Sequence, residues 1–277
     1  MRLHFNLSAC VRATSKFSEC TKCVDACPES IQLMDNLPSF ANKTGVEAAA
    51  CIGVCPTEAF SLSEFSTTEF FFNFLDSKIR LISPKINIPC ISVLSVEHLI
   101  SLALASDETI TMDMSSYDEE SILYEQIEAR IDEANFVLSA FSTKQLETNM
   151  EKVVREEKKE DEEVSSRRSF LGNASLKGVV KHKMTFDEAV EADELKAFQL
   201  DTITISKIRE KNLPDKRKIL FTTLKPADVP EHFDVLAEED ISFVSQKFVD
   251  DSCTNCQICY RICPTGALSS NGKFSLI

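Results

Sequence analysis

Residues 253–264 read Cys253-Thr254-Asn255-Cys256-Gln257-Ile258-Cys259-Tyr260-Arg261-Ile262-Cys263-Pro264, which is the spacing C-x2-C-x2-C-x3-C-P. Three thiolates at intervals of three residues allow one tight loop to hold three corners of a cubane iron–sulfur cluster, while the fourth thiolate, a helical turn later, faces away. Pro264 fixes φ and removes an N–H, which turns the chain away from the ligated loop. A single zinc ion would need two separated pairs of cysteines and would leave the third cysteine without a role. We therefore predict a [4Fe–4S] cluster here, with zinc or no metal as the alternatives.

The C-x-x-x-C-P element that ends this stretch occurs twice more, near the N-terminus. Its three copies begin at Cys23, Cys51 and Cys259, and each continues with one or two residues, a small residue and a large apolar residue. The first two copies are 28 residues apart, as two halves of one small unit would be. The repeats therefore predict a cysteine module, an insert and a second cysteine module.

The first half of the N-terminal module has three of the four expected cysteines, because Cys20, Cys23 and Cys27 are present and Phe17 stands at the first ligand position. Cys10 is the natural substitute, since a nine-residue loop lets it fold back.

The second half of this module retains Cys51 and Cys55, but Gly45 and Ala48 stand where two further ligands would be. At the other end of the chain, no later C-P follows Cys263 to supply a fourth ligand. Either the sequence is truncated, or the remnants of the N-terminal module complete the C-terminal site.

Over residues 8–62 and 241–277 the chain resembles the bacterial [4Fe–4S] ferredoxin-type domain family, and its layout is similar to the iron–sulfur companions of formate dehydrogenase and related molybdoenzymes. The resemblance implies one-electron transfer through cubane clusters. Its crossed ligation would place Cys10, Cys20 and Cys23 with Cys55 on one cluster. It would leave Cys27 and Cys51 as remnants of a second site, either vestigial or completed from the other module. The candidate ligands, for two clusters, are Cys10, Cys20, Cys23, Cys27, Cys51, Cys55, Cys253, Cys256, Cys259 and Cys263.

The insert has the pattern of a small α/β domain. Apolar periodicity predicts strand, helix, strand and helix in turn, over Ile86–Leu94, Val96–Ala105, Thr109–Met114 and Glu120–Phe141. We expect three further features of this domain: a core role for the run Phe70-Phe71-Phe72 with Phe74, an inert buried thiol at Cys90, and a packed or rim position for His98.

Residues 147–164 contain eight acidic and four basic side chains, which predicts a linker or a solvated helix. The pattern then becomes helical over Thr185–Lys211 and, after Pro214, over Arg217–Leu224, and Ile241–Val249 reads as an edge strand. The predicted fold class is α+β, with ferredoxin-like modules at residues 1–64 and 241–277 bracketing an α/β insert at 65–145 and a charged helical linker at 146–240.

The composition bears on partners and location. Thirty Lys and Arg against 44 Asp and Glu give a net charge of −14, which disfavours nucleic acid as a partner. There is no apolar run of membrane-spanning length and no secretory signal at the start, so we expect a cytoplasmic protein without a membrane span. The segment Ser166–Leu171 resembles a twin-arginine motif, but it lies in mid-chain without an apolar segment after it. A basic stretch or a docking surface is the preferred interpretation.

These observations predict a protein that is not an enzyme and that relays single electrons through two [4Fe–4S] clusters. Its partner would be a redox protein, with formate dehydrogenase or another molybdoenzyme as the candidate. The alternative is a non-catalytic accessory or maturation protein for such an enzyme, in which the clusters are structural.

Overall fold

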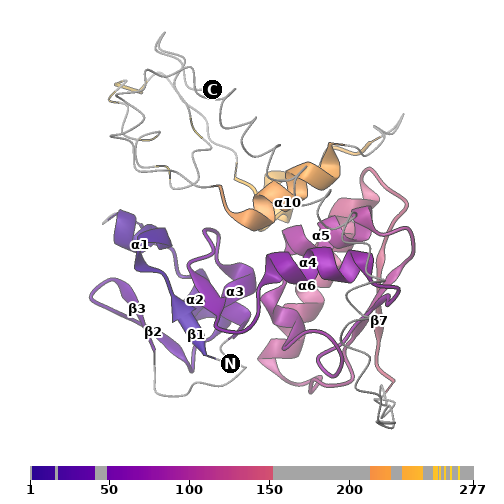
Figure 1. The fold of residues 1–277 in the computed structure, drawn as a ribbon. Helices are drawn as coiled ribbons and strands as arrows, with labels where there is room; N and C mark the ends of the chain where they lie inside the picture. The colour runs from indigo at the N-terminus through magenta and orange to yellow at the C-terminus, as the bar shows by residue number, and fades with distance from the viewer. Residues whose placement is uncertain are drawn as a thin grey trace, which may run out of the picture.

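The computed structural model describes residues 2–15, 18–40, 49–151, 213–225 and 233–245, together with residues 252–254, 256, 259, 263 and 268. In these residues the architecture is mixed α/β, which agrees with the predicted mixture of helices and strands. An N-terminal unit of short strands and helices lies beside an insert with a parallel sheet, and a helix from the C-terminal third packs on the insert (Figure 1).

The strands of the N-terminal unit form two antiparallel pairs: β1 (Leu3–Phe5) with β4 (Phe60–Leu62), and β2 (Ile31–Met34) with β3 (Leu37–Phe40). Asp35 and Asn36 form the two-residue turn between β2 and β3, with φ values of 49° and 66°. Two successive positive φ values are what a type I′ hairpin requires, and Asp and Asn tolerate them better than most residues. The short loop therefore sets the register of this hairpin.

Short helices in the same unit position the cysteines. They are η1 (Leu7–Ala9), α1 (Val11–Thr14), α2 (Lys22–Ala26) and α3 (Ala50–Val54). Cys10 lies between η1 and α1, Cys23 lies in α2, and Cys27 is the C-cap of α2. Cys51 lies in α3, and Cys55 is the C-cap of α3. Because α2 and α3 pack against each other, cysteines distant in sequence lie close together.

The insert is built on three parallel strands in the order β5-β6-β7: β5 (Leu81–Ile82), β6 (Ile110–Asp113) and β7 (Leu146–Asn149). Its helices are α4 (Thr67–Asp76), η3 (Ile91–Val93), α5 (Val96–Ala105) and α6 (Ile122–Ser139). Because α5 and α6 each connect two parallel strands, the order β5-α5-β6-α6-β7 consists of two crossover units. Side chains of the strands and helices share one buried core, which includes Ile82, Leu102, Ile110, Met112 and Ala134.

Most element predictions for the insert are confirmed. The observed α5 begins and ends where the apolar spacing predicts, and β6 and α6 lie inside their predicted ranges. Phe70, Phe71 and Phe74 are buried as expected, and so are Cys90 and His98.

The strand predicted at Ile86–Leu94 is wrong. The backbone carbonyl of Ser83 accepts hydrogen bonds from the N–H groups of Ile86, Asn87 and Ile88, so this segment turns, and η3 follows. Pro84 and Pro89 lack N–H donors for a ladder, which explains why an apolar segment is not a strand here. The strand next to β6 is instead β5, immediately before the turn.

The insert also extends beyond residue 145, where the linker was predicted to begin. Strand β7 pairs with β6 from Ile110↔Leu146 to Asp113↔Asn149, so residues 146–149 belong to the sheet. The rest of the charged segment to residue 164 and the helix expected at Thr185–Lys211 lie outside the described residues, apart from residues 150 and 151.

Two segments of the C-terminal third are described as continuous chain. Helix α10 (Asp215–Leu224) confirms the helix expected after Pro214, and it packs on α5 (Figure 1). The other segment contains η4 (Glu238–Asp240). Residues 241–245 form a turn and irregular chain, so the edge strand expected at Ile241–Val249 is wrong over these residues, and its remainder lies outside the described ones. Among the helices that the structure describes, none combines the length and apolarity needed to cross a membrane.

Candidate metal centre

Four cysteines of the N-terminal unit line one small cavity, with a volume of about 20 Å³. They are Cys10, Cys20, Cys23 and Cys55, and we call this set the sulfur quartet. It is the set that the ferredoxin resemblance assigns to one cluster. Cys10, Cys23 and Cys55 are buried, whereas Cys20 is partly exposed, so one side of the cavity approaches the surface. The walls between the sulfurs are largely apolar and include Val11, Pro38 and Phe60.

Arg12 holds two of the loops around this cavity in place. Its Nε donates a hydrogen bond to the carbonyl oxygen of Cys20, and its Nη1 donates to the side-chain oxygen of Asn36 in the β2–β3 turn. A single guanidinium with several donors in a fixed fork can join two loops in this way. The arginine therefore fixes the Cys20 loop against the hairpin.

The sulfurs of the quartet are close enough to affect one another's ionisation. Burial, together with the smaller effects of the neighbouring Cys20, Cys55 and Cys10, raises the pKa of Cys23 to about 11. Burial also raises the pKa of Cys20, and the nearby Cys55 and Cys10 act in the same direction. Cys20 and Cys23 therefore hold their protons at neutral pH, and a metal must displace these protons on binding. Several thiolates in one small cavity therefore need a positively charged core between them.

The sulfur of Cys55 has hydrogen-bond donors around it, as ligating sulfurs commonly do. The backbone N–H of Ala59 donates a hydrogen bond to the Cys55 sulfur over 3.2 Å, and the Thr57 hydroxyl lies 3.9 Å from the same sulfur. Hydrogen bonds to cluster sulfurs are one means by which a protein sets a reduction potential. The donors, the cavity and the four thiols together fit an iron–sulfur cluster.

A single metal ion and a cluster place different demands on the arrangement of their ligands. Within the described residues, no three His, Cys, Asp or Glu side chains lie close enough together to hold one metal ion. A [4Fe–4S] cluster takes one thiolate at each of four irons, so its ligands surround a space instead of meeting at one atom. The sulfur quartet has this surrounding arrangement.

Cys27 and Cys51 do not line the quartet cavity, and their side chains hydrogen-bond to each other. Both sulfurs are buried, with residue exposures of 5% and 0%. The hydrogen bond from Cys51 lowers the pKa of Cys27, and backbone N–H groups and the nearby Arg130 add to this effect against the opposing effect of burial. The same hydrogen bond and burial raise the pKa of Cys51. The structure therefore separates the quartet from a second, paired set.

The sequence analysis missed Arg130, which lies on α6 beside this pair. It is only 8% exposed, and its guanidinium donates to the carbonyl oxygens of Ser92, Leu94 and Ala50. A detectable signal was its place in the apolar stripe of the helix, three residues after Ile127. A charged residue at such a position must find buried partners, and this one bridges the insert and α3.

Gly53 in α3 leaves the space through which Arg130 reaches these carbonyls. A Cβ at this position would lie 2.6 Å from an Nη1 atom of Arg130 and 2.7 Å from the carbonyl oxygen of Leu94. Both distances are far below normal contact, so the glycine is required for this close packing.

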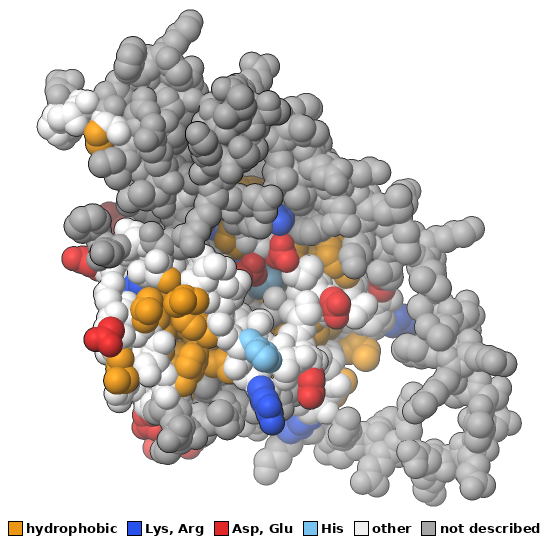
Figure 2. All heavy atoms as spheres, turned by 60° about the vertical axis from the view of Figure 1, so that its left-hand side comes forward, with side chains coloured by type: hydrophobic (Ala, Val, Ile, Leu, Met, Phe, Trp, Pro, Cys, Tyr) orange, Lys and Arg blue, Asp and Glu red, His pale blue; other side chains and the backbone are white. Residues whose placement is uncertain are grey.

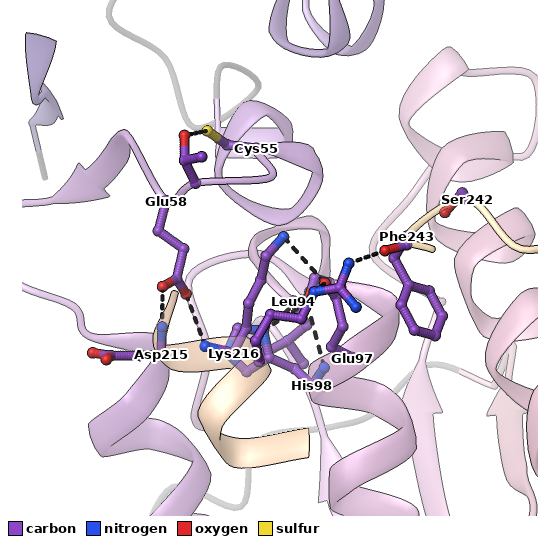
Figure 3. A network of polar contacts seen from close by, with 12 residues as sticks. Cys55, Glu58, Leu94, Glu97, His98, Asp215, Lys216, Ser242 and Phe243 are labelled. Atoms are coloured by element: carbon purple, nitrogen blue, oxygen red, sulfur yellow. Dashed lines mark hydrogen bonds and ion pairs between the residues drawn. The ribbon is translucent and has the colours of Figure 1, made fainter. Parts of the chain in front are cut away.

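The loop after Cys55 is joined to α10 (Figure 3). Glu58 has a φ of 52°, and its carboxylate accepts hydrogen bonds from the backbone N–H groups of Asp215, at 2.5 Å, and Lys216, at 3.3 Å. A carboxylate at the start of a helix satisfies N–H groups that have no partner within the helix. Burial raises the pKa of Glu58 although these hydrogen bonds and Lys216 oppose that effect.

Further along the same network, Glu97 on α5 binds two cations of α10 (Figure 3). Its Oε1 lies 3.5 Å from Nζ of Lys216 and 3.2 Å from Nε of Arg217. Arg217 also stacks over the ring of Phe243, at 5.1 Å from the centroid, and donates to its carbonyl oxygen. This network fixes α10 and residue 243 on the insert.

The structure describes the C-terminal cysteines only in part. Cys253, Cys256 and Cys259 are exposed and Cys263 is half-buried, whereas Cys27 and Cys51 are fully buried. Most residues around the C-terminal cysteines lie outside the described part of the chain, so a site shared with Cys27 and Cys51 stays a prediction.

Comparisons with known proteins support the iron–sulfur interpretation at the C-terminus. Residues 247–269 match the sequence model of the 4Fe-4S binding domain, and this range contains all four C-terminal cysteines. A search of curated proteins found no match, and neither did a search of solved structures. The domain match implies a [4Fe–4S] cluster in residues 247–269, and it supports a ferredoxin-type iron–sulfur protein.

Proposed function

We propose that this protein transfers single electrons between two [4Fe–4S] clusters and a redox partner, and that it is not itself an enzyme. One cluster would be held by the C-terminal cysteines and the other by the sulfur quartet. The observation that carries the proposal is that Cys10, Cys20, Cys23 and Cys55 line one cavity, in a chain whose residues 247–269 match a 4Fe-4S binding domain.

The residues around the quartet would perform the roles that such a site needs. A bound [4Fe–4S] cluster supplies a one-electron couple. The N–H of Ala59 would stabilise charge on the Cys55 sulfur, and Arg12 would hold the Cys20 loop and place a positive charge near the thiolates. Apolar walls at Val11, Pro38 and Phe60 would exclude water. None of these roles requires the protein to donate a proton or to act as a nucleophile.

The surface beside the quartet would receive the partner. Phe60 lines the cavity, and its ring packs against Phe5 and against Phe40, which is 42% exposed. Met34 in the same hairpin is 62% exposed. Figure 2 shows hydrophobic side chains gathered on the N-terminal part of the molecule. An exposed apolar patch next to a redox centre suits transient docking, because it brings the partner's acceptor close to the cluster.

We propose a redox enzyme as the partner, with a formate dehydrogenase or related molybdoenzyme as the candidate, on the similarity of layout alone. The net charge of −14 would favour a partner with a basic docking face. The proposed location is the cytoplasm, because cysteines clustered at metal-ligand spacing are kept as thiols in a reducing compartment.

The second candidate is a non-catalytic accessory protein in which the clusters stabilise the fold. The observation in its favour is the connection from Cys55 through Glu58 to α10, because a metal-bound loop would then hold a distant helix in place. In this case the client enzyme would bind the folded chain, and no electron would pass through the clusters.

An anaerobic reductive titration distinguishes the two candidates. For a relay, we expect reversible one-electron reduction of the clusters within the range that iron–sulfur clusters span, from about −700 to +450 mV. The fully reduced protein should pass its electrons to an added one-electron acceptor and return to the starting spectrum. Clusters that cannot be reduced, or that fall apart when reduced, would favour the accessory protein.

A further inference from the structure

Cys27 and Cys51 form a pair of buried thiols that the proposed electron transfer does not use. Their sulfurs are in hydrogen-bond contact although the residues are 24 positions apart in the sequence. They come from two packed helices, since Cys27 is the C-cap of α2 and Cys51 lies in α3. No disulfide joins them in the structure. Their proximity therefore results from the fold and not from a covalent bond.

The geometry of the pair suits a disulfide. A sulfur–sulfur bond is about 2 Å long, so two sulfurs already in contact need to approach by on the order of 1–2 Å. Short helices such as α2 and α3, of five residues each, can shift by this amount without unfolding the insert. Cys27 retains 5% exposure, which leaves a narrow path for a small oxidant, whereas Cys51 has none.

The surroundings provide polar support on one side of the pair. Arg130 lies nearby, and the partners of its guanidinium among the described residues are backbone carbonyls, with no carboxylate in ion-pair contact. A nearby positive charge favours negative charge on a neighbouring sulfur. The two thiols and the arginine therefore lie together in one buried polar group.

We propose that Cys27 and Cys51 are a redox-active dithiol that closes to a disulfide when the protein meets a peroxide. One thiol takes an oxygen atom from hydrogen peroxide, so that the O–O bond breaks, a sulfenic acid forms and water leaves. The second thiol then attacks the sulfenic sulfur, the S–S bond forms and a second water leaves. Two thiols and one peroxide thus give one disulfide and two waters, and a dithiol reductant reverses the change.

The closed form would tie together the two helices that carry ligands of the sulfur quartet. Cys23 lies in α2, one turn before Cys27, and Cys55 follows α3, one turn after Cys51. A disulfide between the helices would keep these two ligands near each other after oxidative loss of iron. The dithiol would therefore preserve the site for reloading. The linkage itself does not depend on whether the quartet carries electrons.

The test is a disulfide map of the full-length chain after stepwise addition of hydrogen peroxide, made on both the iron-loaded and the iron-free protein. Trypsin releases Cys23 and Cys27 in residues 23–43, and Cys51 and Cys55 in residues 44–78. Cleavage before Asp25 separates Cys23 from Cys27, and fragmentation of the second peptide between residues 51 and 55 assigns its sulfur. We expect a Cys27–Cys51 link in both preparations, with a mass lower by two hydrogen atoms, which dithiothreitol removes.

Two variants serve as controls. Cys90→Ala removes another buried thiol, at 2% exposure, and should leave the link unchanged. Cys51→Ala should abolish it and leave Cys27 as a sulfenic acid that dimedone traps. Wild-type protein whose Cys27 links to Cys23 or Cys55, or forms no link before other cysteines are over-oxidised, contradicts the proposal. If the Cys27–Cys51 link forms in Cys90→Ala as it does in wild type, the oxidation is specific to this pair and is not a general oxidation of buried thiols.

Discussion

At the scale of single residues, two polar side chains have hydrogen-bond partners that only the fold brings to them. Arg130 and Glu58 reach partners 80 and 157 positions away in the sequence, at Ala50 and Asp215. Such partners depend on the complete tertiary structure, which explains why motif spacing did not reveal either residue. The cysteines differ in this respect, because their type and spacing carry the chemistry directly. The prediction that His98 is packed rather than a ligand also depended only on its apolar neighbours.

His98 gives a prediction about pH. Burial lowers its pKa to about 4, from an ordinary value of 6.5, with Glu97 opposing this effect and Lys216 adding to it. Its Nε2 has no hydrogen-bond partner among the described residues, so the neutral ring is the favoured form in the fold. Between pH 6.5 and 4 the unfolded chain then binds the additional proton, so the free energy of unfolding should fall as the pH falls through this range.

The measurement is urea unfolding of wild type and His98→Gln at several pH values from 7 down to 4. Gln can retain the cap that His98 forms with Ser95. Relative to the variant, wild type should lose up to about 3 kcal/mol of stability between pH 6.5 and 4. Parallel curves for the two proteins would show that folding does not lower the pKa of His98.

At the scale of elements, the spacing of apolar residues predicted helices correctly where one face of the helix packs on the core. The α5 and α6 helices follow their apolar spacing because each buries a stripe against the sheet. Apolar spacing failed at residues 86–94, where Pro89, together with Pro84 and the Ser83 turn just before this range, decides the backbone conformation despite apolar side chains. It also failed at residues 241–245, because these are held by Arg217 and Glu133 side chains and not by a neighbouring strand. Alternation alone cannot show whether a partner strand exists.

Helix α10 gives the prediction at this scale. Lys216 and Glu97 are each 3% exposed, and Arg217 adds a second cation to the same carboxylate. Glu97→Gln removes the negative charge and leaves Lys216 buried without it, which should cost about 3–5 kcal/mol. Because α10 packs on α5 through this contact, hydrogen exchange at residues 215–224 should become faster.

Asp132→Asn provides the matched control, since it makes the same chemical change at an exposed position of α6. Hydrogen exchange at α10 in Asp132→Asn should equal that of wild type. Equal protection of α10 in Glu97→Gln and wild type would show that apolar packing, not the ion network, holds the helix.

At the scale of the whole molecule, both ends of the chain carry clustered cysteines, but different observations bear on each cluster of cysteines. The C-terminal cysteines match a known domain in residues 247–269, and their motif was readable from the sequence. The sulfur quartet depends on Cys10, which lies outside the repeated motif, and on Cys55, which lies 32 positions after Cys23. The ferredoxin resemblance predicted this grouping, and the fold brings the same four residues to one cavity. The separate pairing of Cys27 with Cys51 required the structure.

The central claim is that the sulfur quartet binds an iron–sulfur cluster in addition to the C-terminal one. The most direct measurement is iron and acid-labile sulfide per chain, with electron paramagnetic resonance of the reduced protein, on anaerobically prepared wild type, Cys55→Ser, Cys256→Ala and Cys90→Ala. We predict about eight irons for wild type and for Cys90→Ala, and about four for each of the other two variants, which should lose different signals. About four irons in wild type and no change in Cys55→Ser would contradict a cluster at the quartet.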